Sequence, residues 1–216
     1  MSTIVADGSI LSIASTYGTS VVMSAITNAT EAVATLGAGH AVVVGDFLEV
    51  SSAWPDLDGK ILRVKTVATN DVTLEGFNTT DVTKFPAAGG AGTIKRITAW
   101  ANLGQITDID TTGGDQQYYQ FQYLNQLQSQ QVPIGKSPIV MSLMMADDIT
   151  LAQMAILRTA EQSGSPKGMR IVFRNATRTL ANGYWSMAYM PKIKIGEANK
   201  RAIGFSLSAL PQEYST

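Results

Sequence analysis

The sequence contains no cysteine and a single histidine, His40. The absence of cysteine excludes a disulfide framework, a thiolate metal site and a thiol nucleophile, and it is consistent with a reducing compartment. His40 ends a GAGH stretch, and no G-x-S-x-G motif accompanies it to indicate a Ser-His-Asp triad. The glycines at 37–39 and 45 lack the spacing of a phosphate-binding loop, which favours turns. We therefore predict no catalytic residue, no metal site and no cofactor.

Charge of neither sign predominates, with 16 Lys and Arg against 17 Asp and Glu and a formal net charge of -1. The overall charge therefore does not indicate a protein that wraps around nucleic acid phosphate. Long hydrophobic runs are also missing, because no stretch reaches about eighteen apolar residues. The first ten residues show no basic start followed by an apolar run. The sequence predicts a cytoplasmic, soluble product with no membrane insertion.

What the sequence does contain is a series of short runs rich in β-branched residues, each bounded by Gly, Asp, Asn or Pro. The first two, 8–15 and 20–27, are separated by TYGT and are predicted to form a hairpin. Four more are typical of a small all-β module and cover 41–52, 59–68, 71–77 and 92–100. Later strands are predicted over 138–148, 169–175, 179–195 and 200–210. The methionines of the first of these, Met141, Met144 and Met145, are expected in the core.

One helix is predicted, at about 147–163, in DDITLAQMAILRTAEQSG. Asp147 or Asp148 can cap its N-terminus and Gly164 can end it. Apolar residues recur at three- and four-residue steps and are expected to pack on a sheet: Ile149, Leu151, Ala152, Ala155, Ile156 and Ala160. The predicted fold class is α+β, mainly antiparallel β.

Residues 113–138 form a polar, aromatic segment that is rich in glutamine and almost free of charge. Its length and weak amphipathicity predict a functional loop, or one that orders only against a partner. Its aromatic residues could stack on single-stranded bases, but no basic residue lies among them to follow the backbone, which favours an interface. The candidate contact residues are Tyr118, Tyr119, Phe121, Tyr123, Gln126 and Gln128.

Asp108 and Asp110 are two positions apart in TDID, so on a strand both carboxylates would point to one face. Such a pair could bind a cation or present negative charge. Two ligands do not make a calcium site, and we favour a solvated acidic face.

From Ile97 onward the order of motifs resembles the tail tube proteins of long-tailed bacteriophages. The motifs are W-x-x-L-G-x-I-T-D, the glutamine-rich segment, the DD-led helix, N-G-Y-W-S-M and G-F-S-L-S-A-L-P. Within 24–97, GDFLEV and LDGKILRV resemble small β modules that recur in phage structural proteins. The resemblance implies a discontinuous core of 1–23 and 98–216, a tail-tube-type β-sandwich or barrel, and an inserted β-barrel-like module at 24–97.

The resemblance also implies a function, that of a virion protein without enzymatic activity. Its subunits would form hexameric rings that stack into a tube around a channel for DNA ejection. The expected partners are further copies, the tape measure, tail terminator and baseplate or tip proteins, and DNA in transient, sequence-independent passage. The protein would be made in the host cytoplasm and end in the virion tail. The alternatives, in decreasing order, are another ring-forming tail component, a carbohydrate-binding β module and an enzyme.

Roles for individual residues follow from this expectation. The aromatic and glutamine candidates of 113–138 would contact neighbouring subunits or the next ring. A channel for DNA is expected to be neutral or acidic, because clustered Lys and Arg would hold phosphate. Asp108, Asp110 and Glu197 are therefore the candidates for the lumen. Basic residues, namely Lys192, Lys194, Lys200 and Arg201, are expected at ring contacts or on the outside.

Overall fold

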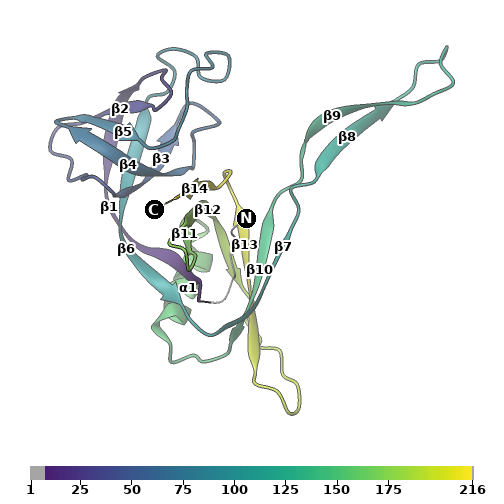
Figure 1. Cartoon of the computed structure of the whole chain (residues 1–216). Helices are drawn as coiled ribbons and strands as arrows, with labels where there is room; N and C mark the ends of the chain where they lie inside the picture. Colours follow the sequence, from purple (N-terminus) through teal and green to yellow (C-terminus); the bar gives the residue numbers. More distant parts are fainter. Residues whose placement is uncertain (1–7, 216) are drawn as a thin grey trace.

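The computed structural model describes residues 8–215, which form fourteen strands and one helix (Figure 1). The strands are β1 (Ile10–Ile26), β2 (Val33–Leu36), β3 (Phe47–Ser52), β4 (Ile61–Ala68), β5 (Asp71–Leu74), β6 (Gly92–Leu103), β7 (Ile106–Thr112), β8 (Gln116–Phe121), β9 (Gln130–Lys136), β10 (Val140–Ala146), β11 (Lys167–Val172), β12 (Arg178–Met187), β13 (Lys200–Leu207) and β14 (Gln212–Tyr214); the helix is α1 (Ala152–Ser163). All pairings between them are antiparallel, which confirms the predicted α+β, mainly antiparallel β class.

The first half of the chain builds a small closed barrel, at the upper left in Figure 1. The strand order runs β2-β5-β4-β3-β6-β1, and a further pairing of β2 with β1 closes the circle. The barrel interior is filled by aliphatic and aromatic side chains, with Trp54, Leu48 and Leu62 among the fully buried ones. Closure leaves no open edge in this part of the sheet, which removes a site of aggregation.

The rest of the sheet continues from the same two strands in the order β6-β1-β11-β12-β13-β10-β7. One face packs on α1 through a second core that includes Ile13, Leu143 and Phe205. The side-chain amide of Gln153 on α1 accepts a hydrogen bond from the Gly104 backbone N–H at 2.9 Å and donates one to the Gly104 carbonyl at 3.0 Å. These two bonds connect the helix to the link between β6 and β7. The helix therefore packs against the sheet, as the sequence predicts.

Strands β1 and β6 run through both parts of the molecule, and this corrects the predicted hairpin at 8–27. TYGT is no turn: Tyr17 pairs with Ile97 inside a ladder with β6, and bulges between Ala14 and Ser20 absorb the bend. The expected boundaries at 23/24 and 97/98 fall within β1 and β6, so the division into two domains stays a prediction.

Helix α1 begins later than predicted, at Ala152 rather than 147. The carboxylate of Asp148 instead accepts bonds from the Thr150 backbone N–H and hydroxyl, at 2.9 and 2.6 Å, in a turn before the helix. Gly164 does end it, with a left-handed φ of 58°. The fully buried residues of the helix are Met154, Leu157 and Ala160, and the predicted Leu151 and Ile156 are half-buried against the same core. The prediction was wrong for Ile149, Ala152 and Ala155, which are exposed.

Two of the three methionines of β10 are core residues. Met141 and Met145 lie in the second core, whereas Met144 points to the opposite, partly exposed face, because strand side chains alternate. No helix in the described part of the chain is long and apolar enough to cross a membrane.

Candidate assembly surfaces

Strands β8 and β9 form a ribbon that projects far from the body of the molecule (Figure 1). Among the residues that the structure describes they pair only with each other, and residues 113–138 are therefore a two-stranded hairpin rather than the loop that the sequence predicts. The two strands pair from Gln116 opposite Lys136 to Phe121 opposite Gln130, and backbone hydrogen bonds join them. The composition of the segment does not indicate these bonds. An isolated two-stranded ribbon is at best marginally stable in water, so a partner surface would stabilise it.

One face of this ribbon is aromatic and apolar. The rings of Tyr119 and Phe121 stack with centroids 6.2 Å apart, and Phe121 meets Tyr123 edge to face at 5.3 Å. Val132 on β9 is the cross-strand partner of Tyr119. Ile134, two residues after Val132 on the same strand, is 64% exposed. Exposed apolar residues on a projecting segment mark an interaction site.

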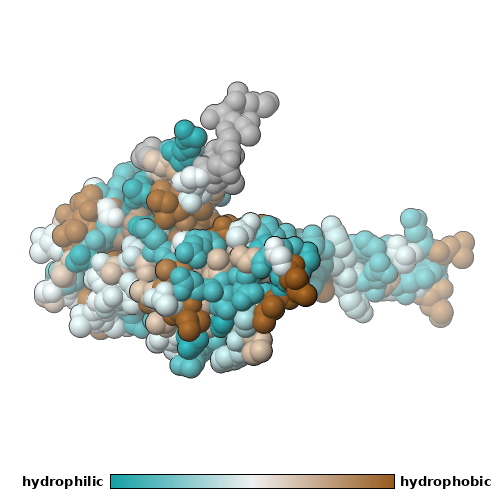
Figure 2. Space-filling view, turned by 90° about the horizontal axis from the view of Figure 1, so that it is seen from below, coloured by the Kyte–Doolittle hydropathy of each residue, from teal (hydrophilic) through white to brown (hydrophobic). Residues whose placement is uncertain are grey.

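The other candidate residues of the hairpin lie elsewhere on it. Tyr118 points to the opposite face, because adjacent strand residues alternate. Gln126 lies in the tip, where its backbone oxygen accepts a 2.7 Å bond from the Gln122 amide. Gln128 is exposed in the same tip, whose Leu124 and Leu127 are fully exposed and form its hydrophobic end in Figure 2. The structure thus brings together Tyr119, Phe121 and Tyr123.

The second surface is the face of the sheet opposite α1. Asp108 and Asp110 share this face of β7, opposite Met144 and Ser142 of β10, and both are exposed. The face continues onto β13 and β12 with small uncharged residues, namely Ala202, Gly204 and Ser186. Lys200 lies at its end, opposite Ala146. The result is a weakly acidic face, which also carries the half-exposed side chain of Tyr184 on β12.

The remaining charged candidates lie in or beside the turn between β12 and β13. Glu197 belongs to this turn rather than to the acidic face, and it pairs with Lys194 and, at 4.0 Å, with Lys200. Lys192 is exposed.

Arg201 was expected at a surface, and this was wrong. It is 5% exposed, binds Asp147 at 2.7 Å, and donates to the carbonyls of Ala188 and Tyr189. A buried charge requires such a partner, which the sequence places 54 residues away.

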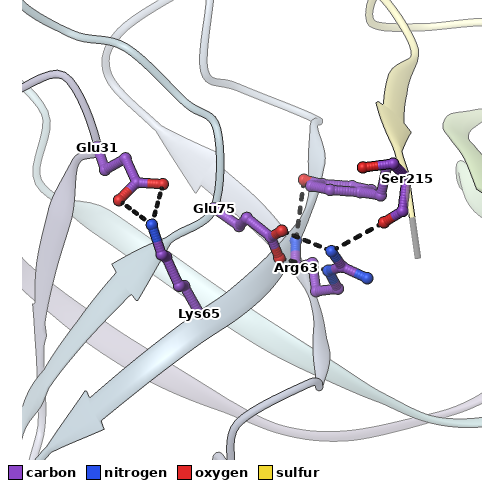
Figure 3. Close-up of polar contacts among 6 residues, drawn as sticks. Glu31, Arg63, Lys65, Glu75 and Ser215 are labelled. Carbon is purple, nitrogen blue, oxygen red and sulfur yellow. Dashed lines mark hydrogen bonds and ion pairs between the residues drawn. The ribbon is translucent and has the colours of Figure 1, made fainter.

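A seam of polar contacts fixes the barrel to the C-terminal strand (Figure 3). The Arg63 guanidinium on β4 pairs with Glu75 and donates to the carbonyl of Ser215 at 3.3 Å. The Arg63 backbone N–H donates to the Tyr214 hydroxyl at 3.0 Å, and burial raises the pKa of that phenol to about 12. Beside it, Lys65 binds Glu31 within the barrel. The two parts of the sheet are therefore joined by side chains as well as by β1 and β6.

A half-buried carboxyl, that of Glu49 on β3, lies near residues from both parts of the sheet. Burial raises the pKa of Glu49, and its Oε2 has no hydrogen-bond partner among the described residues. It faces Tyr17 of β1, Lys95 of β6, Lys167 of β11 and Asp58. Burial, and then the charge of Glu49, raise the pKa of the Tyr17 phenol. The Glu49 carboxyl is therefore easier to protonate in the folded state than in the unfolded state.

We expect Glu49→Gln to raise Tm at pH 7 by about 2–4 °C, as a gain near 1 kcal/mol does in a chain of this size. The pKa of Glu49 is higher in the folded state than in the unfolded state. The carboxyl therefore stabilises the fold most at pH values below its unfolded-state pKa, and this stabilisation is lost as the pH rises through its folded-state pKa. The difference from wild type should therefore vanish toward pH 4.5. Thermal melts across this range check it, with exposed Glu213→Gln as the matched control. An equal gain in Tm at pH 7 and at pH 4.5 would contradict this prediction.

His40 contributes to a turn rather than to a site: its Nε2 lies 2.9 Å from the carbonyl oxygen of Thr69. Gly45 takes a left-handed φ of 87° and donates its N–H to Val64, as expected of a turn residue. Across residues 8–215, no cluster of three or more His, Cys, Asp or Glu side chains is arranged to hold a metal ion.

The described residues thus form an antiparallel β protein whose most prominent exposed features are a projecting hairpin and one face of the sheet. A family model described as "Phage tail tube protein, TTP" matches residues 52–216, and the chain belongs to this family. No curated protein matches the chain. The match confirms the resemblance stated from the motifs. It identifies a structural protein of the bacteriophage tail, one that assembles with itself and with other tail proteins in the virion.

Proposed function

We propose that this subunit forms hexameric rings that stack into a tail tube enclosing the channel for DNA ejection, without enzymatic activity. The observation that carries the proposal is the projecting hairpin, whose aromatic face is not covered by any other element within residues 8–215. Ordering such a ribbon costs conformational entropy, which contacts with another copy can offset. Its uncharged amides can enter an interface without the cost of burying charge. Its partners in the tail would be the tape measure, tail terminator and baseplate or tip proteins.

Ring closure is supported by the open edges of the sheet. Within the described residues β7 pairs only with β10, and the 98–103 half of β6 pairs only with β1. Each edge exposes backbone N–H and C=O groups along one side. Joining the edges of neighbouring subunits in a closed cycle would satisfy them and avoid open-ended aggregation.

The channel lining is assigned to the weakly acidic sheet face. Asp108 and Asp110 are the carboxylates on it, and its other side chains are mostly small and uncharged. DNA phosphates are repelled rather than held by such a surface, so a duplex could slide along it. Glu197 would lie near the mouth of the channel, on the β12–β13 turn, rather than on the lining itself.

Electron microscopy of the purified protein tests this function directly. We expect tubes of indefinite length built from six-fold rings, with DNA-sized channels. Closed single rings that never elongate would favour another ring-forming tail component. Monomers that bind glycans would favour a carbohydrate-binding module. Either outcome would overturn the proposed tube.

The closed barrel is proposed as an inserted module on the outer wall of the tube. Thr16 and Ala99 are cross-strand partners, so Asn-Gly can replace residues 17–98 as a two-residue hairpin turn. We expect this deletion to lower Tm, because Phe47, Ile61 and Ile97 cover Leu180 and Tyr214. Tubes should still form, with a smaller outer diameter by microscopy. A folded but assembly-incompetent deletion variant would place the barrel in the core instead.

A further inference from the structure

Two arginines on adjacent strands share the sheet face opposite α1. Arg170 on β11 is the cross-strand partner of Leu180, and Arg178 on β12 is the partner of Val172, so the two side chains are diagonal neighbours. Both are half-buried. In the part of the chain that the structure describes, no carboxylate forms an ion pair with either guanidinium. Two like charges at this spacing repel one another.

An aromatic pair holds the two guanidiniums in place. That of Arg170 lies over the Trp100 ring, 4.7 Å from its centroid, and that of Arg178 lies 6.0 Å from the centroid of Phe47. The two rings meet edge to face with their centroids 6.0 Å apart. The intervening strand β1 places Ser12, a small and fully buried residue, opposite Arg170 and so leaves room for its side chain. Both guanidiniums are therefore positioned before any ligand binds, which lowers the entropy cost of binding.

The hydrogen-bonding capacity of Arg170 is not used within the subunit. Its Nε is buried and has no hydrogen-bond partner within residues 8–215. Burial, and then the charge of Arg178, lower the pKa of Arg170. A guanidinium nevertheless stays charged in proteins and offers five N–H donors in a fixed fork. Two adjacent forks without a carboxylate therefore favour a bound anion that has several oxygens.

The arginine pair lies where the barrel meets the rest of the sheet. Phe47 belongs to β3 of the barrel, and it shares a small core with Leu180 and Tyr214 of the C-terminal strands. Strands β13 and β10 separate β12 from β7 and its two aspartates. The pair and the proposed channel lining therefore occupy different parts of the sheet.

We propose that Arg170 and Arg178 form a binding site for a phosphate group, held between the two guanidiniums at the junction of barrel and sheet. Each fork donates parallel hydrogen bonds to phosphate oxygens. A carboxylate has two oxygens and one charge, whereas a phosphate group has at least three acceptor oxygens and a charge of about −2, which offsets both cations. The ligand is inorganic phosphate or a phosphate monoester, because both carry this group.

Thermal melts of the purified protein test the site. We expect sodium phosphate at about 50 mM to raise Tm by at least about 3 °C over sodium chloride of equal ionic strength, as a ligand well above its Kd does. Arg170→Gln and Arg178→Gln, each alone, should remove most of this difference. Arg158→Gln is the matched control, because Arg158 is an exposed arginine of α1 on the other face of the sheet, and it should keep the difference. Equal Tm values in the two salts, or a difference that survives both substitutions, would overturn the proposal.

Tryptophan fluorescence gives a second readout that does not depend on stability. Trp54 and Trp185 are 1% and 4% exposed, whereas Trp100 is half-buried beneath Arg170. Phosphate bound by Arg170 should change the emission in a saturable way, and Trp100→Phe should abolish this change. Arg170→Lys keeps the charge but removes the fork, so it should weaken binding at least about tenfold. A change that does not saturate, or that Arg170→Lys leaves intact, would count against the site.

The same titration distinguishes the sources of the phosphate group. A nucleoside monophosphate that binds more tightly than inorganic phosphate would identify a monoester as the ligand, and weaker binding would identify inorganic phosphate. Sodium acetate is the control for a carboxylate and should bind at least about tenfold more weakly. Equal affinity for acetate would overturn the assignment to phosphate.

Discussion

Replacing Tyr119 and Phe121 by serine should leave a folded subunit that no longer polymerises. The two rings stack on the exposed face of the hairpin, outside both cores, so removing them costs the folded subunit little. At an interface, buried aromatic anchors contribute about 2 kcal/mol or more each. We therefore expect the critical concentration for assembly to rise by at least about a hundredfold, measured by light scattering and microscopy.

The opposite face of the same ribbon supplies a matched control. Tyr118→Ser with Gln120→Ser removes a comparable area from that face, because the two residues alternate with Tyr119 and Phe121 along β8. This variant should assemble close to the wild-type rate. Equal loss in both variants would show that the ribbon is needed as a whole and that no aromatic face is recognised. Normal filaments from the first variant would remove the hairpin from the assembly contacts.

Changing Asp108 and Asp110 to lysine should permit assembly yet reduce genome delivery by at least about a hundredfold. Both side chains are exposed on β7 and contribute to neither core, so the fold should tolerate the change. In a six-fold ring the substitutions would line the channel with cationic groups at every layer. Each phosphate contact releases counterions and adds to binding, so a passing duplex would be held.

Infectivity of virions carrying the altered tubes, counted against particle number, measures this effect. Asp108→Asn with Asp110→Asn is the control, because a neutral lining should release DNA nearly as well as the native one. Full infectivity of the lysine variant would remove this sheet face from the lumen. An assembly defect in the lysine variant would instead place the two aspartates at a ring contact.

The proposed stacking through the projecting hairpin would also let a subunit stay unassembled until it meets a partner surface. The hairpin has no core of its own, and its aromatic face gains most when another surface covers it.

The sequence by itself determined the strand-rich class, most strand positions and the end of the helix at Gly164. These depend on local rules, because period-two patterns and turn residues act within a few neighbouring positions. The likeness in the motifs after Ile97 also sufficed to reach the family, which the match over 52–216 confirms.

Only the tertiary structure decided the features that depend on distant partners. Residues 8–27 read as a hairpin, yet residues 11–23 form one ladder with β6, and bulges turn the expected break into a bend. Arg201 read as a surface charge, yet Asp147 pairs with it and lets it be buried. The ribbon at 116–136 read as a loop, because its cross-strand hydrogen bonds leave no local pattern. In each case a pairing across the fold outweighed the local propensity, and such pairings are set by packing rather than by neighbouring residues.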